Sequence, residues 1–138
     1  YRASFDKLWG YTNVVRLGAE HLSDDGNIVL VSGAPARRAK PGQAAIASVG
    51  GAVEQFVRAV TAELAPKRIN VVSPGVIDTP MFGNDADARA KMLGGATAKN
   101  LVPRAGTPEE VAEGIMFVVK NGFVTGTTID VDGGWILS

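Results

Sequence analysis

Short apolar runs that alternate with helical patterns constrain the fold of this chain more than any other feature. Ile28–Val31 is apolar at every position, which is typical of a parallel strand covered on both faces. Two further short runs, Ile69–Val72 and Thr127–Val131, follow it, and helical patterns separate the three. Strands that alternate with helices predict right-handed crossovers. We therefore expect an α/β fold whose three strands form one parallel sheet.

The first two helices are delimited by apolar periodicity and by the residues that follow them. Ser4–Leu22 places its apolar residues on one stripe, and Gly26 beyond it is suited to a left-handed helix stop. A long helix is expected over Ala44–Leu64 and must end before Pro66, because proline cannot continue a helix.

The last helix has a clear start signal. Thr107 can cap it, Pro108 suits its first position, and Glu110 completes a capping box. The helix is expected to end at Asn121. The segment before it, Gly83–Asn100, is rich in Gly, Asp and Ala, which predicts a mobile stretch without regular structure.

Composition narrows the class of protein. The chain has 138 residues, enough for one domain, and its 14 basic and 14 acidic residues balance. This balance argues against nucleic-acid or membrane-surface binding. There is no cysteine, the acidic residues show no metal-ligand spacing, and no apolar run is long enough to cross a bilayer, so we expect no metal site and a cytoplasmic location. The chain begins at Tyr1 within a helical pattern, so we expect an N-terminal portion to be missing.

Four stretches together carry a resemblance to a known family. They are Gly26–Ser32, Ala62–Val72, Ser73–Met81 and Thr125–Gly134, and in this order and spacing they resemble the short-chain dehydrogenase/reductase family. The resemblance covers essentially the whole chain. It implies the C-terminal half of a Rossmann-like, doubly wound parallel sheet.

On this resemblance, residues 1–138 form a single partial NAD(P)-binding domain. The absent N-terminal half would carry the glycine-rich turn that holds the cofactor pyrophosphate. The implied function is an NAD(P)(H)-dependent oxidoreductase that acts on a small alcohol or carbonyl substrate. NAD or NADP would be the cofactor, with NADP favoured. The first two helices would pair with a second subunit, which implies a homodimer or homotetramer.

The resemblance places the cofactor at the ends of two strands. The backbone around Val76 and Ile77 would bind the nicotinamide carboxamide, and the Thr79 hydroxyl would assist. The other predicted cofactor-binding residues are Pro74, Gly75, Ser32 and Gly33. An alternative explanation is purely local, with Pro74-Gly75 making a tight turn and Thr79 capping the next short helix.

The catalytic positions depart from the family pattern. Ile46 stands where the family has its tyrosine, Gly50 where it has its lysine, and Gly33 where it has its serine. Lys7 replaces the asparagine of the preceding helix. Neither isoleucine nor glycine can move a proton, so the catalytic group is unknown.

Several polar side chains are candidates to replace the missing groups. They are Ser32, Ser48, Lys7 and the cluster Arg37, Arg38 and Lys40. The simpler interpretation of the cluster is a solvated loop, and that of Lys7 a charge on a helix surface. Two functions therefore stay open, a divergent oxidoreductase with a rewired site and a non-catalytic nucleotide-binding or assembly protein of the same fold. A third possibility is a purely structural fragment.

Overall fold

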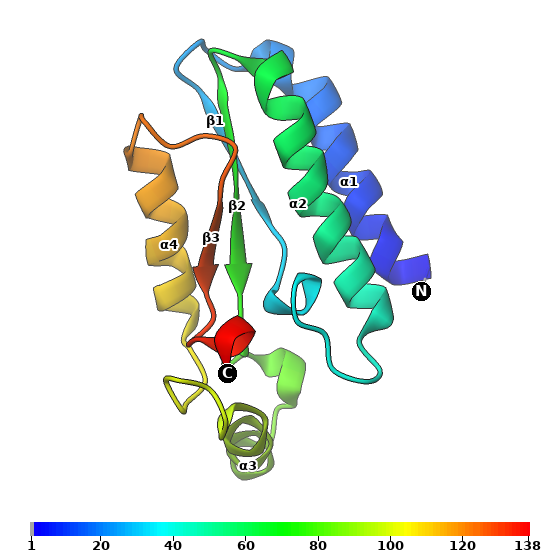
Figure 1. Ribbon diagram of the computed structural model, residues 1–138, viewed down its shortest axis with the longest axis vertical. Coiled ribbons are helices and arrows are strands. Elements are labelled where there is room, and N and C mark those ends of the chain that lie inside the picture. Colours follow the sequence, from blue (N-terminus) through cyan, green and yellow to red (C-terminus); the bar gives the residue numbers. More distant parts are fainter. Residues whose placement is uncertain (1) are drawn as a thin grey trace.

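The computed structural model describes residues 2–138, which form a three-stranded parallel sheet packed between helices (Figure 1). The strands lie in the order β1 (Asn27–Val31), β2 (Arg68–Pro74) and β3 (Thr128–Val131). The longer helices are α1 (Arg2–Gly18), α2 (Ala44–Leu64), α3 (Ala86–Thr97) and α4 (Pro108–Lys120). The predicted α/β class, with three parallel strands that alternate with helices, is confirmed.

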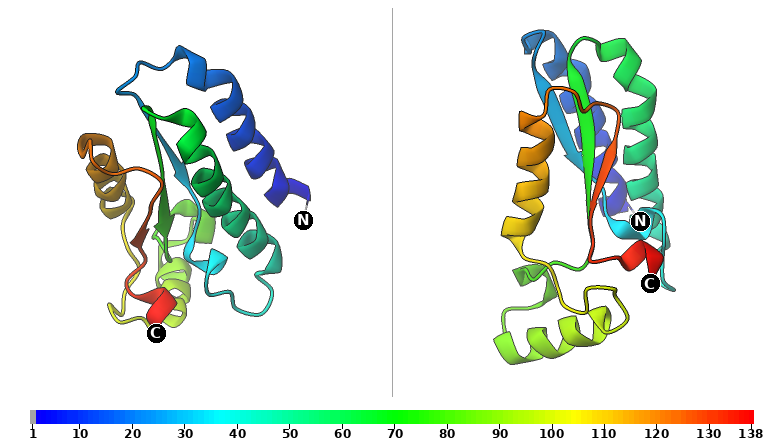
Figure 2. Two further views of the ribbon diagram at one scale, coloured as in Figure 1. Left: turned by 45° about the horizontal axis from the view of Figure 1, so that its top comes forward. Right: turned by 60° about the vertical axis from the view of Figure 1, so that its left-hand side comes forward.

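The helices form two layers around the sheet. Helices α1 and α2 lie side by side on one face, and α4 covers the other (Figures 1 and 2). The main core lies under α2, where Val53 and Val57 pack with Ile69 and Val71 of β2. Burying each of these side chains contributes roughly 1.5–3 kcal/mol, so the face of α2 that meets the sheet is the main anchor of this layer.

Because the strands are parallel, their carboxyl ends meet at one edge of the sheet. Helix α3 and the end of the chain lie beyond this edge (Figure 1). Ligands of open α/β sheets bind at such an edge, so the fold brings the segments that follow β1 and β2 to the position where a site is expected.

The helix bounds were well predicted where a stop or cap residue is present. Helix α2 begins at Ala44 and ends at Leu64, as expected from Pro66. At α4 the Thr107 side chain accepts from the Glu110 N–H, and the Glu110 side chain accepts from the Thr107 N–H, so the predicted capping box is present. Of residues 2–138, no helix is both long and apolar enough to cross a membrane.

Two local expectations are wrong. The predicted irregular stretch Gly83–Asn100 contains α3, which Asp85 caps by accepting from the Ala88 N–H at 2.8 Å, and which Leu93 anchors by its burial. Gly26 does not adopt a left-handed conformation. A Cβ at Gly26 would instead lie 2.8 Å from the Ser23 carbonyl oxygen, so glycine is needed because there is no room for a side chain.

Candidate functional site

The segment after β2 passes very close to the end of β3. A Cβ at Gly75 would lie 2.7 Å from both the Cα and the carbonyl oxygen of Asp132. The Gly75 N–H donates to the Val131 carbonyl at 3.0 Å. Gly75 does not have a left-handed backbone. Glycine is therefore required here because the two backbones approach so closely that a side chain would clash. This contact fixes where the next residues lie.

Ile77 has its backbone polar groups directed toward the open side of this turn. Gly106 donates to the Val76 carbonyl at 2.9 Å and accepts from the Asp78 N–H at 2.9 Å, which makes an isolated parallel bridge to Ile77. In a parallel ladder a residue's own N–H and C=O point away from the partner that bonds its neighbours. Within residues 2–138, the N–H and C=O of Ile77 take no hydrogen bond. One donor and one acceptor side by side complement a primary carboxamide.

Thr79 precedes the short 3-10 helix Pro80–Phe82, but its hydroxyl makes no side-chain capping bond. The local explanation of Thr79 as a cap is therefore wrong. The residue lies two positions beyond Ile77, on the same extended segment, with an extended backbone (φ −142°, ψ 161°). A hydroxyl in this place is available to a ligand held by Ile77.

A salt bridge at the N-terminus of α4, which we call the Arg104–Glu110 lock, lies next to the bridge from Gly106. Arg104 donates to Glu110 at 2.9 and 2.6 Å, and the Thr107 N–H donates to the same carboxylate at 2.9 Å. These contacts, Arg104 first, lower the pKa of Glu110 to about 2. A cavity of about 460 Å³ opens beside this lock and reaches Val76 and Ile77. The carboxylate thus helps to shape the segment that pairs with the turn.

At the end of β1, Ser32 and Gly33 have different surroundings. The Ser32 hydroxyl donates to the Glu54 carboxylate at 2.8 Å, so it faces α2. A Cβ at Gly33 would lie 3.8 Å from the Pro74 carbonyl oxygen, an ordinary contact, so Gly33 borders the β2 turn. The structure therefore brings Gly33 and Pro74 together, while the Ser32 side chain is directed toward α2.

The two family positions on α2 hold no polar group. Ile46 is 50% exposed. Gly50 is buried against the turn that follows β1, where an added Cβ would lie 2.9 Å from the Ala36 Cβ and 3.7 Å from the Gly33 carbonyl oxygen. A lysine at Gly50 would have to displace Ala36. The turn after β1 occupies the space beside Gly50.

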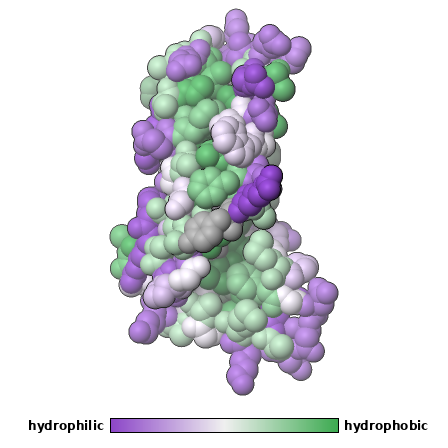
Figure 3. Space-filling view, turned by 90° about the vertical axis from the view of Figure 1, so that its right-hand side faces the viewer, coloured by the Kyte–Doolittle hydropathy of each residue, from purple (hydrophilic) through white to green (hydrophobic). Residues whose placement is uncertain are grey.

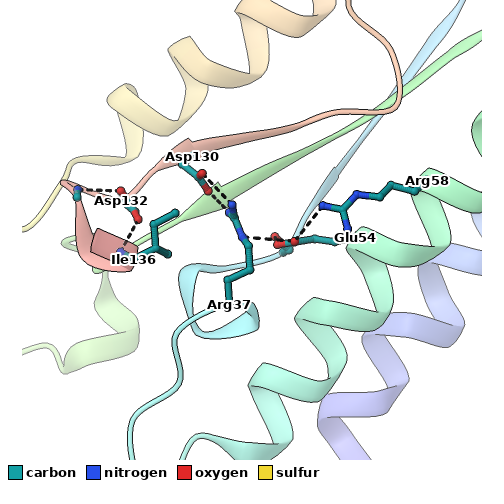
Figure 4. A network of polar contacts seen from close by, with 8 residues as sticks. Arg37, Glu54, Arg58, Asp130, Asp132 and Ile136 are labelled. Atoms are coloured by element: carbon teal, nitrogen blue, oxygen red, sulfur yellow. Dashed lines mark hydrogen bonds and ion pairs between the residues drawn. The ribbon is translucent and has the colours of Figure 1, made fainter. Parts of the chain in front are cut away.

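A polar network lies one helical turn beyond Gly50, and its central residue, Glu54, was not among the predicted site residues. Glu54 is only 3% exposed and accepts from Ser32, with Arg37 at 3.5 Å and Arg58 at 3.9 Å (Figure 4). Arg37 also forms a bidentate pair with Asp130 of β3. The carboxylate of Asp130 raises the pKa of Arg37. The available signal was spacing, because residues 46, 50 and 54 lie four apart on one face of α2.

The basic cluster is exposed, as expected for a solvated loop, but its side chains have specific partners. Besides the Arg37 pair, Arg38 donates to the Trp135 carbonyl at 2.9 Å, and the Trp135 indole N–H donates back to the Arg38 carbonyl at 3.1 Å. The Lys40 ammonium lies 3.7 Å from the Trp135 ring centroid. These contacts fasten the loop after β1 to the end of the chain.

The remaining two candidates lie in different places. Ser48 is exposed, and its hydroxyl donates to the Ala44 carbonyl of its own helix at 2.8 Å. Lys7 is exposed as a residue, but its ammonium reaches the Ser32 carbonyl at 3.5 Å and lies 5.6 Å from the Tyr11 ring centroid. Loss of hydration lowers the pKa of this ammonium.

The chain has relatives of known family in sequence and in fold. The family model described as enoyl-(acyl carrier protein) reductase matches residues 6–136. A short-chain dehydrogenase/reductase of Stachybotrys chlorohalonatus is 39% identical over 111 residues, which cover 80% of this chain and 44% of that protein. A cyclopentanol dehydrogenase of Comamonas testosteroni is 41% identical over 116 residues, covering 80% and 45%.

A solved small-chain dehydrogenase in complex with NADPH superposes with a TM-score of 0.91 at 34% identity, over 97% of this chain and 62% of that one. The chain spans about half the length of the curated relatives it matches, at 44% and 45% of the two named above. The match of the family model over nearly all residues and the similarity of sequence and fold lead to one conclusion: the chain belongs to the short-chain dehydrogenase/reductase family.

Proposed function

We propose that this protein is an NAD(P)(H)-dependent oxidoreductase that acts on a small alcohol or carbonyl compound through a rewired catalytic site. The observation that carries the proposal is the pair of backbone groups of Ile77, which project from the end of β2 without a partner among residues 2–138. Unpaired backbone groups at a strand end are suited to a ligand that restores both hydrogen bonds. A nicotinamide carboxamide offers that donor and acceptor.

The residues that would hold the cofactor follow from this pair. Ile77 would bind the carboxamide and Thr79 would add a hydroxyl, while Pro74, Gly75 and Val76 set the path of the segment. Gly33 would border the nicotinamide from β1, and Ser32 would act indirectly, through its bond to Glu54. When bound, the nicotinamide supplies or accepts a hydride. The chain's own residues orient the ring and exclude water from one side of it.

The pyrophosphate end of the cofactor needs residues that this chain does not contain. We propose that residues 1–138 are one partial nucleotide-binding domain, and that a preceding half carries the glycine-rich turn. The shares of 44% and 45% of the relatives' lengths support this proposal. Binding experiments therefore require the full-length protein.

Three finer statements belong to the same proposal. NADP is favoured over NAD, with support from the small-chain dehydrogenase solved with NADPH. The cytoplasm is the expected location. A homodimer or homotetramer is supported by the outer side of α1, where Trp9 is 65%, Val14 60% and Leu17 58% exposed. Figure 3 shows apolar side chains gathered along this face of the molecule.

Fluorescence titration of the full-length protein with NADPH and NADH tests the proposal. We expect NADPH to bind, and Thr79→Val to weaken binding by roughly 3–10-fold, the effect of about one neutral hydrogen bond. Ser48→Ala is the matched control, because it removes an exposed hydroxyl that bonds its own helix. If the folded protein binds neither nucleotide, the proposal is wrong. Binding without turnover of cyclopentanol or other small alcohols would favour the non-catalytic alternative.

A further inference from the structure

Carbonyl reduction needs a proton as well as a hydride, and the three family positions cannot provide one. Gly33, Ile46 and Gly50 carry no ionisable side chain. A positioned proton donor typically contributes about 10²–10⁴ to the rate. If the proposed function is correct, another side chain must reach the ends of β1 and β2.

Lys7 reaches this place from the neighbouring helix. Its ammonium lies 3.5 Å from the Ser32 carbonyl oxygen, at the last peptide before Gly33. The missing side chain of Gly50 would begin 3.7 Å from the next carbonyl oxygen, that of Gly33. The Lys7 ammonium and Gly50 therefore lie near adjacent carbonyl groups at the end of β1.

The other basic side chains near this corner are engaged elsewhere. Arg37 is paired with Asp130 and Glu54, and Arg58 contacts Glu54. Lys40 lies over the Trp135 ring and reaches the Ala96 carbonyl at 3.5 Å. Lys7 has only a neutral carbonyl and a tyrosine ring as its contacts in residues 2–138. Its proton is thus not held by a carboxylate.

We propose that Lys7 of α1 is the proton donor of this site and takes over a role that α2 has lost. This inference rests on the proposed function. A hydride from reduced nicotinamide forms a C–H bond to the carbonyl carbon, while one N–H bond of Lys7 breaks and an O–H bond forms on the carbonyl oxygen. The products are an alcohol, oxidised nicotinamide and a neutral amine, which regains its proton from water. In the oxidative direction the neutral amine accepts the hydroxyl proton.

The electrostatic surroundings are compatible with this role. Loss of hydration lowers the pKa of Lys7, which makes proton release easier near neutral pH. The Lys7 ammonium lies 5.6 Å from the ring centroid of Tyr11 on its own helix. Ser32, whose carbonyl it reaches, donates its hydroxyl to Glu54 of α2, and Glu54 pairs in turn with Arg37 of the loop. The charge of Glu54 is already offset by Arg37 and Arg58, so it does little to hold the proton on Lys7.

Amine labelling tests the assignment without any turnover. The full-length protein is acetylated with acetic anhydride over a pH series, and the extent at each lysine is read by mass spectrometry. We expect Lys7 to react faster near pH 8 than the exposed Lys99 and Lys120, because loss of hydration lowers the pKa of its ammonium. Saturation with NADP⁺ should slow the labelling of Lys7 and leave the two controls unchanged. Equal labelling of all three lysines, with no protection of Lys7, would overturn the assignment.

Kinetics then separate a proton donor from a charge that only supports the fold. With cyclopentanol and NADP⁺ as probes, Lys7→Gln should lower kcat/KM by about 10²-fold or more and remove the pH dependence due to Lys7. Lys7→Arg, which keeps the charge but holds its proton, should be almost as impaired, and Lys99→Gln should match the parent. NADPH affinity should change little in all three variants.

The outcomes distinguish this inference from the function on which it rests. If the parent binds NADPH and turns over the probe while Lys7→Gln retains its rate, only the Lys7 assignment fails. If Lys7→Arg restores the rate, the residue acts through its charge and is not the donor. If the folded parent binds no nucleotide, the proposed function fails as well. The labelling result decides the assignment even where the probe alcohol is not turned over.

Discussion

The β2 turn, residues 74–79, and the corner formed by Gly33, Ile46 and Gly50 lie at the same edge of the sheet but differ in how they could act. The turn offers backbone groups, held in place by Gly75 against β3 and by the bridge from Gly106. The corner would have to act through side chains, and at its three family positions it has none that can transfer a proton. The turn therefore presents free backbone groups, whereas the corner is closely packed against Ala36.

The difference has a physical reason. Recognition by backbone N–H and C=O groups depends on the path of the chain, which many contacts fix together. Most nearby side chains can therefore be substituted without loss of these groups. Chemistry by side chains depends on single residues and is lost with one substitution. At the corner, Ala36 fills the space beside Gly50, and the Glu54 network ties the loop to the sheet. Four predictions test this difference between the turn and the corner.

The largest effect is expected where two backbones meet. Gly75→Ala should destabilise the protein by about 3 kcal/mol, because the new Cβ would meet the Asp132 backbone, which cannot move without shifting β3. Gly51→Ala is the control. Its Cβ has only the Ala36 carbonyl oxygen within reach, at 3.9 Å. There we expect a gain of roughly 0.5–1 kcal/mol from helix propensity. Urea unfolding followed by circular dichroism measures both, and similar values for the two variants would contradict the close-approach argument.

The second effect tests whether the closely packed corner depends on its ionic network. Arg37→Met should cost about 2 kcal/mol in unfolding free energy, because Glu54 is 3% exposed and loses its nearer cationic partner. The Arg37→Met/Glu54→Gln double variant should recover part of this loss. Arg89→Met is the matched control, since its partner Asp78 is 49% exposed, and we expect less than about 1 kcal/mol there. Equal losses in the two single variants would show that burial of Glu54 is unimportant.

The third effect asks whether the family residues can be restored. Gly50→Lys should destabilise the protein by roughly 1–2 kcal/mol through overpacking against Ala36, despite a better helix propensity. Adding Ala36→Gly should relieve most of the loss. Ile46→Tyr, at a position that is 50% exposed, should change stability by less than about 0.5 kcal/mol. Thermal melting of the three variants measures this, and a stable Gly50→Lys single variant would show that the corner is not closely packed.

The smallest effect concerns the support of the β2 turn. The pKa of Glu110 falls from 4.5 to about 2 on folding, so its contribution to stability is present above pH 4.5 and is lost as the pH falls toward 2. Melting temperatures of the parent and Glu110→Gln should therefore converge over that range. The effect should be small because Arg104 and Glu110 are partly exposed and screened by water. Glu109→Gln serves as the control, and curves that stay parallel down to pH 2 would contradict the lock.

The sequence predicted the fold better than the site. Pro66 and the Thr107–Glu110 capping box set helix bounds locally, so the expected ends of α2 and the start of α4 were correct. Gly83–Asn100 was misjudged because its composition is typical of loops, whereas the Asp85 cap and the burial of Leu93 stabilise a helix there. The predicted cofactor-binding residues and the unknown catalytic group stay predictions until nucleotide binding is measured.

Three properties can be derived from local periodicity, from caps and from residue identity. They are the order of strands and helices, their parallel arrangement, and the lack of proton-transferring side chains at positions 33, 46 and 50. Three others become visible only in the folded chain: Gly75 lies against Asp132, Arg37 pairs with Asp130, 93 positions away, and Lys7 reaches the end of β1. Such contacts join segments far apart in the chain, and their strength depends on how far folding excludes water from them. Neither property can be derived from a local sequence pattern.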